Sequence, residues 1–161
     1  MSVSKEKKKH KLKTDELEQI LKGTHPDDVE QYSIDNADEM LSEDREFRNY
    51  MKEKLKEKGL KEQDVLVRAD IPLGFGYKLF SQEKTTQQRD TILRICYGAE
   101  LNFEETQHIL KLYHMPLLYA RDKRDAMLIS CINHRVGGII EVNEALVRNK
   151  LSPLRGSGTQ E

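Results

Sequence analysis

Residues 59–80 read GLKEQDVLVRADIPLGFGYKLF, and this stretch decides the fold. Two short helices are predicted in it, at 61–69 and 73–82. Asp70-Ile71-Pro72 separates them, because proline cannot continue a helix and restricts the residue before it. The inward positions of the two helices are Val65, Leu66 and Ala69, then Phe75, Leu79 and Phe80. The pattern predicts two helices that meet at a tight turn and share one core.

Helical patterns continue on both sides of this stretch. Phe47, Met51 and Leu55 recur at four-residue spacing within 44–58, and Gly59 ends that helix. Asn102 is expected to cap a later helix, with a carboxylate three residues further on. The other helices are predicted at 14–22, 26–41, 86–97, 102–113, 125–134 and 139–150. No segment alternates polar and apolar residues convincingly, so we predict an all-α fold.

The charge along the chain is uneven although the net charge is only −1. Residues 1–13 carry +5, residues 14–46 carry −10, residues 47–101 carry +3 and residues 102–161 carry +1. We predict five segments on this basis and from the helix pattern. They are a disordered basic arm (1–13), an acidic helical segment (14–43), a central helical domain (44–113), a C-terminal helical hairpin (114–151) and a flexible tail (152–161).

The order of helices in the central domain resembles the lambda-repressor/Cro (XRE-type) helix-turn-helix family. The resemblance rests on 59–66, on Ile71 at the end of the turn, on Leu79 in the third helix, and on 89–95 and 101–105. A closer resemblance is to small bacterial helix-turn-helix regulators with a C-terminal helical hairpin. It rests on 76–80, 88–90, 105–107, 110–112, Tyr119, 124–126 and 141–144. The resemblance implies a five-helix domain that docks its second and third helices at the major groove of DNA.

Three positions depart from the family pattern. Leu66 stands where the second helix usually carries Ala, and Gly76 stands where the third usually carries a branched apolar residue. We infer a volume exchange in which the side chain of Leu66 fills the space left by Gly76. Asp70 replaces the usual turn Gly, and aspartate is one of the residues that adopts a left-handed conformation at modest cost.

The resemblance also indicates candidate DNA contacts. The first turn of the third helix, residues 72–75, offers no side-chain hydrogen bond to a base edge, whereas such turns usually do. We expect contacts with phosphates and thymine methyls instead, from Lys61, Leu73, Phe75, Tyr77, Lys78, Gln82, Lys84, Gln88 and Arg89. The leading hypothesis is a transcriptional regulator that binds duplex DNA, with a homodimer formed through the C-terminal hairpin. The alternative is a protein-interaction adaptor that keeps the fold and binds a protein partner through Leu73, Phe75 and Tyr77.

Other functional classes find little support in the sequence. The five histidines and two cysteines show no metal-ligand spacing, and no catalytic motif or phosphate-binding loop is present, so we expect no enzyme activity, metal or cofactor. No apolar run approaches the length of a membrane span. Cys96 and Cys131 lie in apolar helical patterns and are expected to be reduced thiols. These features predict a cytoplasmic protein without a membrane partner.

Overall fold

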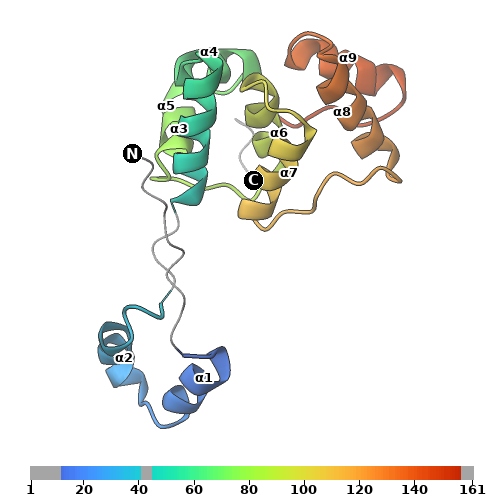
Figure 1. The fold of residues 1–161 in the computed structure, drawn as a ribbon. Coiled ribbons are helices and arrows are strands. Elements are labelled where there is room, and N and C mark those ends of the chain that lie inside the picture. Colours follow the sequence, from blue (N-terminus) through green and yellow to red (C-terminus); the bar gives the residue numbers. More distant parts are fainter. Residues whose placement is uncertain (1–11, 41–44, 157–161) are drawn as a thin grey trace. The chain divides into compact units, whose positions relative to one another are not determined.

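A computed structural model describes residues 12–40 and 45–156 of the chain. The chain divides into two compact units, one within residues 1–44 and the other within residues 45–161 (Figure 1). The described residues form nine α-helices and one 3-10 helix, with no β-strand among them, which confirms the all-α prediction. Residues 1–11, most of the predicted basic arm, lie outside the described residues.

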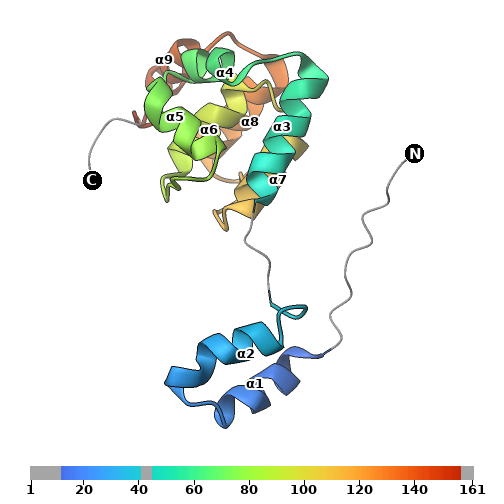
Figure 2. The ribbon, with the colours of Figure 1, turned by 90° about the vertical axis from the view of Figure 1, so that its left-hand side faces the viewer.

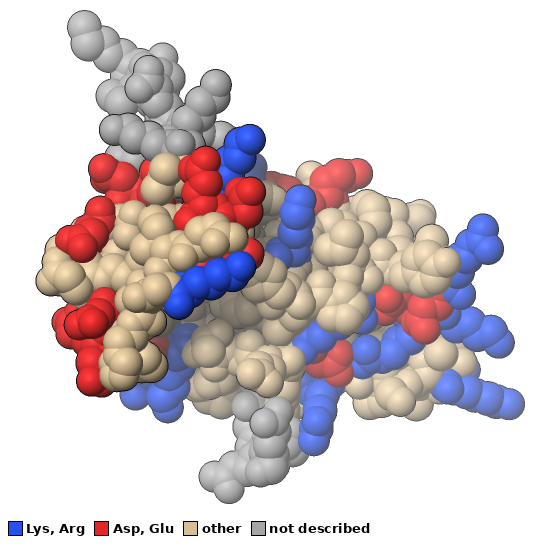
Figure 3. All heavy atoms as spheres, turned by 90° about the horizontal axis from the view of Figure 1, so that it is seen from below, with Lys and Arg blue, Asp and Glu red and all other residues tan. Residues whose placement is uncertain are grey.

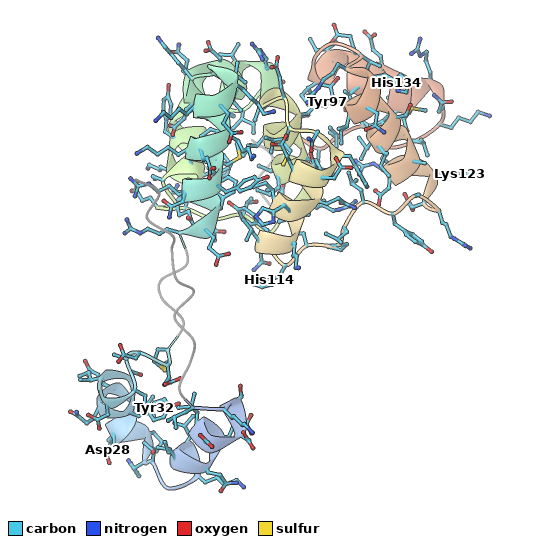
Figure 4. The ribbon with its side chains drawn as sticks, in the orientation of Figure 1. Asp28, Tyr32, Tyr97, His114, Lys123 and His134 are labelled. Carbon is cyan, nitrogen blue, oxygen red and sulfur yellow. The ribbon has the colours of Figure 1, made fainter. Side chains whose placement is uncertain are left out.

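The N-terminal unit is a short helical hairpin of α1 (Thr14–Lys22), η1 (Pro26–Asp28) and α2 (Val29–Asp35). Tyr32 is its one described buried residue and lies on the side of α2 that faces α1 (Figure 4). The helix predicted at 26–41 is shorter than expected. The side-chain Nδ2 of Asn36 donates to the carbonyl oxygen of Tyr32 at 2.9 Å, and such local bonds compete with continuation of a helix.

The second unit contains the remaining described helices, which are α3 (Glu46–Lys58), α4 (Glu62–Ala69), α5 (Leu73–Phe80), α6 (Arg89–Gly98), α7 (Phe103–Leu112), α8 (Lys123–His134) and α9 (Ile139–Arg148). Two of the helix ends are formed by the residues that the sequence predicted there, Gly59 and Asn102. Gly59 ends α3 in the left-handed conformation (φ 65°). Asn102 caps α7, since its Oδ1 accepts from the backbone N–H of Glu105 at 2.8 Å and the Asn102 N–H donates to Oε1 of Glu105 at 3.0 Å.

Helix α6 is the central element of this unit. Every residue from Thr91 to Gly98 is buried, and the helix packs against α4, α7 and α9 (Figures 1 and 2). Gly98 permits the close approach to α4, because a Cβ at this position would lie 2.6 Å from the carbonyl oxygen of Val65. With α6 at the centre, α5 lies at one end of the unit, and α8 and α9 lie at the other.

The C-terminal segment differs from the prediction of a flexible tail at 152–161. Leu154 is buried at 3% exposure, and its backbone N–H donates to Oδ1 of Asn143 at 2.7 Å. The guanidinium of Arg94 donates to the carbonyl oxygens of Leu154 and Arg155, each at 2.8 Å. The prediction is wrong for residues 152–156, because side chains on α6 and α9 bind this backbone. Residues 157–161 lie outside the described residues.

Neither cysteine of the described residues forms a disulfide, and both are buried. Burial raises the pKa of the Cys96 thiol, which keeps it protonated at neutral pH. Within 12–40 and 45–156, no helix combines the length and apolar character needed to cross a membrane.

Candidate nucleic-acid interface

A three-residue turn, Asp70 to Pro72, joins α4 to α5. Asp70 adopts the predicted left-handed conformation, with φ 53°. Ile71 is buried, and its N–H donates to the carbonyl oxygen of Leu66 at 3.0 Å. Pro72 then precedes α5, whose first residue is Leu73. The buried Ile71 and the hydrogen bond that it donates hold the two helices in one relative orientation.

Helix α5 exposes an aliphatic side chain in its first turn and a tyrosine one turn further along. Leu73 is 38% exposed and Tyr77 is 40% exposed, and residues four apart lie on the same face of a helix. Phe75 is half-buried and packs against the core. The first turn therefore presents carbon atoms, and Tyr77 supplies the first exposed hydroxyl, one turn further along. This surface suits contact with thymine methyl groups or with an apolar protein surface.

Three exposed lysines on or next to α4 and α5 form no ion pair with a described carboxylate. Lys61 precedes α4, Lys78 lies on α5 and Lys84 lies in the loop after α5, and all three are exposed. The backbone N–H of Lys84 donates to the carbonyl oxygen of Lys78 at 3.1 Å, which brings these two positions together. None of the three ammonium groups forms an ion pair with a described residue. They are available to bind phosphates.

The two glutamines predicted to contact DNA have partners within the protein. Gln82 adopts a positive φ of 61°, and its Oε1 accepts from the backbone N–H of Arg48 at 3.1 Å. Gln88 occupies the position before α6, where its Oε1 accepts from the Thr91 hydroxyl at 3.4 Å. The predicted cap Thr86 accepts from Gln88 N–H instead, so the cap is Gln88 and α6 begins at Arg89, two residues later than expected. The Gln82 side chain thus links the loop after α5 to α3, and the Gln88 side chain links the loop before α6 to the first turn of α6.

Arg89 is also directed inward, which corrects its predicted role as a phosphate contact. Its guanidinium binds both carboxylate oxygens of Asp125 at 2.9 Å and donates to the carbonyl oxygens of Pro116 and Leu117. Burial alone would raise the pKa of Asp125, but the hydrogen bonds from Arg89 and from Tyr119 N–H outweigh it and lower that pKa. These acceptors bind the N–H groups of the Arg89 guanidinium. Arg89 therefore connects α6 both to α8 and to the loop that precedes α8.

A second arginine–aspartate pair lies between the same two helices. Arg124 on α8 binds both carboxylate oxygens of Asp90 on α6, at 3.0 and 2.9 Å. Arg155 N–H adds a third bond to Asp90. Burial opposes ionisation of Asp90, yet these bonds lower its pKa. Both arginine–aspartate pairs connect positions more than thirty residues apart, so they cannot be read from the local sequence pattern.

Arg94 lies behind the turn between α4 and α5. Its side chain is only 5% exposed, and Nη1 donates to the carbonyl oxygen of Ala69, the last residue of α4, at 3.1 Å. Burial lowers its pKa, against the opposing effect of Asp70 and Asp90. Sequence reasoning missed this residue. The available signal was a single charged position inside the otherwise apolar run 92–96.

The two units differ strongly in charge. Residues 12–40 contain nine carboxylates and two lysines, whereas residues 45–156 contain twenty basic and fifteen acidic residues. Figure 3 shows acidic side chains gathered on the N-terminal helices and lysine and arginine side chains spread over the second unit. The second unit is therefore the one whose charge suits a polyanion.

The comparisons with known proteins give no match to this chain among family models, curated proteins or solved structures. In the part of the chain that the structure describes, no three His, Cys, Asp or Glu side chains are placed to hold a metal ion. His108 and His114, for example, lie on α7 and in the loop after it, and the His108 ring contacts the Tyr50 ring at a centroid distance of 4.5 Å with a tilt of 45°.

Proposed function

We propose that this protein is a DNA-binding transcriptional regulator of the helix-turn-helix type, related in fold to the lambda-repressor/Cro family. Helices α4 and α5 would be the helix pair that meets the major groove. The observation that carries the proposal is the exposed face of α5, with Lys78 on the helix and Lys84 in the loop after it, next to a turn that the buried Ile71 holds in place. Together with Lys61 before α4, these lysines form no ion pair with a described residue. A helix pair held in this way places phosphate contacts at fixed positions along a duplex.

The contacts available favour binding led by phosphates over direct reading of bases. The first turn of α5 has no side-chain donor or acceptor, and Gln82, Gln88 and Arg89 have partners in the protein. Sequence preference would then come from methyl contacts by Leu73 and from Tyr77, together with DNA shape.

The same face supports a second function, that of a protein-interaction adaptor. Leu73 and Tyr77 are exposed apolar side chains on one face of α5, and such a pair is suited to anchor a partner protein. This alternative needs the apolar residues and not the lysines, so substitutions separate the two functions.

Binding of a fluorescently labelled random-sequence duplex by the full chain tests the proposal. We expect the double variant Lys78→Glu/Lys84→Glu to abolish binding at moderate salt. Lys123→Glu is the matched control, because Lys123 is also an exposed lysine and lies at the far end of the unit (Figure 4). If DNA binding is absent in the native chain, and a protein partner is lost on Leu73→Asp but kept by the lysine variant, the adaptor function is correct.

A further inference from the structure

The backbone of the C-terminal segment 152–156 is bound by side chains of α6, α8 and α9. Arg124 donates to the carbonyl oxygens of residues 152 and 153, at 2.9 and 3.1 Å. Arg94 donates to the carbonyl oxygens of residues 154 and 155, both at 2.8 Å. The backbone N–H groups of residues 154 and 155 donate to Oδ1 of Asn143 at 2.7 Å and to Oδ2 of Asp90 at 2.9 Å. These contacts recognise an extended stretch of backbone and do not depend on its side chains.

One side chain of the segment, Leu154, is an apolar anchor. It is 3% exposed, whereas its neighbours Ser152, Pro153 and Arg155 are exposed. An unfilled space of about 10 Å³ remains beside it, about the smallest that admits one water molecule. The pocket around the anchor is lined by Leu93, Tyr97, Leu128, Cys131, Ile132 and Val142. Main-chain hydrogen bonds combined with a pocket for one side chain are typical of peptide recognition.

The charged groups that bind the segment also have partners outside it. Arg124 binds both carboxylate oxygens of Asp90. Arg94, whose side chain is 5% exposed, also donates to the carbonyl oxygen of Ala69 at 3.1 Å. These groups therefore keep hydrogen-bond partners when the segment is absent, and such preorganisation lowers the cost of binding a ligand. The segment follows α9 and no described helix comes after it, so it can leave the site without unfolding a helix.

We propose that α6, α8 and α9 form a peptide-binding site, and that an extended segment of a partner protein displaces its built-in occupant, residues 152–156. The ligand needs a large apolar residue for the Leu154 pocket and free backbone groups on both sides of that residue. A second copy of this chain offers only the same leucine, whereas a partner residue slightly larger than leucine also fills the remaining space. This binding uses no residue of the α5 face and takes place with or without DNA.

Native-state hydrogen exchange of the full chain tests whether the segment leaves the site while the helices stay folded. We expect the Leu154 N–H to exchange through an opening of lower free energy than the N–H of Ile95, which lies in the buried part of α6. We also expect low urea concentrations to change this opening little, because it exposes little surface. Equal free energies for the two amides would show that the segment opens only with the whole unit and would overturn the proposal.

Binding of a fluorescently labelled peptide with the sequence of residues 149–156 tests the site directly. The segment competes in the native chain at high local concentration, so we expect the full-chain variant Leu154→Asp to bind the peptide at least tenfold more tightly than the native chain. Ser152→Ala is the matched control in the same segment, since Ser152 is exposed, and it should behave like the native chain. A peptide with alanine in place of Leu154 should bind at least tenfold more weakly. Equal affinities of the native and Leu154→Asp chains, or of the two peptides, would overturn the proposal.

Discussion

Gly76 on α5 lies directly against Leu66 on α4. A Cβ at Gly76 would be 2.9 Å from Cγ of Leu66 and closer still to both Cδ atoms. This contact confirms the volume exchange inferred from the sequence, in which the large residue on one helix occupies space that the small residue leaves on the other.

Gly76→Ala is expected to destabilise the protein by about 1–3 kcal/mol through overpacking, although alanine favours helix. Gly74→Ala is the matched control on the same helix, since nothing lies within 4 Å of its added methyl, and it should stabilise by about 0.5–1 kcal/mol. Adding Leu66→Ala to Gly76→Ala should cost less than the sum of the two single changes in urea unfolding. Additive costs would show that the two positions do not share space.

The bidentate pair between Arg89 and Asp125 leads to a second prediction. Arg89→Ala should lower the free energy of unfolding by about 2–4 kcal/mol, because Asp125 is left buried without its main partner. Lys84→Ala, at an exposed position that forms no ion pair with a described residue, should change stability by less than about 0.5 kcal/mol. Urea denaturation measures both. Equal, small effects would return Arg89 to the list of candidate DNA contacts.

Acid should weaken the connection between α6 and α8. The pKa values of Asp90 and Asp125 are lowered in the folded protein, so each carboxylate adds stability above its unfolded pKa and loses it as the pH falls through its folded pKa. We expect the free energy of unfolding to fall as the pH drops below about 4. The fall should be smaller in Asp125→Asn, which has already lost its contribution. Parallel pH profiles for the two proteins would contradict this expectation.

The anchored C-terminal segment gives a fourth prediction. Leu154→Ala should lower the free energy of unfolding by about 2–4 kcal/mol, because Leu154 packs with Leu93, Tyr97 and Val142 between α6 and α9. Leu117→Ala removes the same group from a residue that is 48% exposed and should cost less than about 1 kcal/mol. Thermal unfolding of the two variants with equal midpoints would indicate that residues 152–156 do not contribute to the core.

The sequence predicted the helices well where local chemistry determines them. Gly59, Asn102 and Asp70 each act on residues within four positions, so their effects on helix ends and on the turn can be read from the printed sequence. The roles of Arg89, Arg94 and Arg124 could not, because their partners lie 25 to 61 positions away and are brought near only by packing on α6. Leu154 was missed for the same reason, since its short segment shows no helical period.

In the candidate site too, features that depend on local sequence could be predicted, whereas features that depend on distant partners could not. Exposure of Lys61, Lys78 and Lys84 follows from their positions on short amphipathic helices and in a loop, and the structure agrees with it. Gln82, Gln88 and Arg89 were equally polar in the sequence. Their internal partners lie on α3, on α6 itself and on α8, and all three residues are half-buried, whereas the three lysines are exposed.

The most direct test of the proposed function is fluorescence anisotropy with the full chain and a labelled random-sequence duplex at several salt concentrations. We predict that the logarithm of the association constant falls linearly with the logarithm of salt concentration, with a slope of about −3 for three phosphate contacts. Lys78→Glu/Lys84→Glu should reduce the magnitude of this slope by about 2, while Lys123→Glu should leave it unchanged. No binding at low salt, or a slope that the Lys78/Lys84 variant does not alter, would contradict DNA binding through α4 and α5.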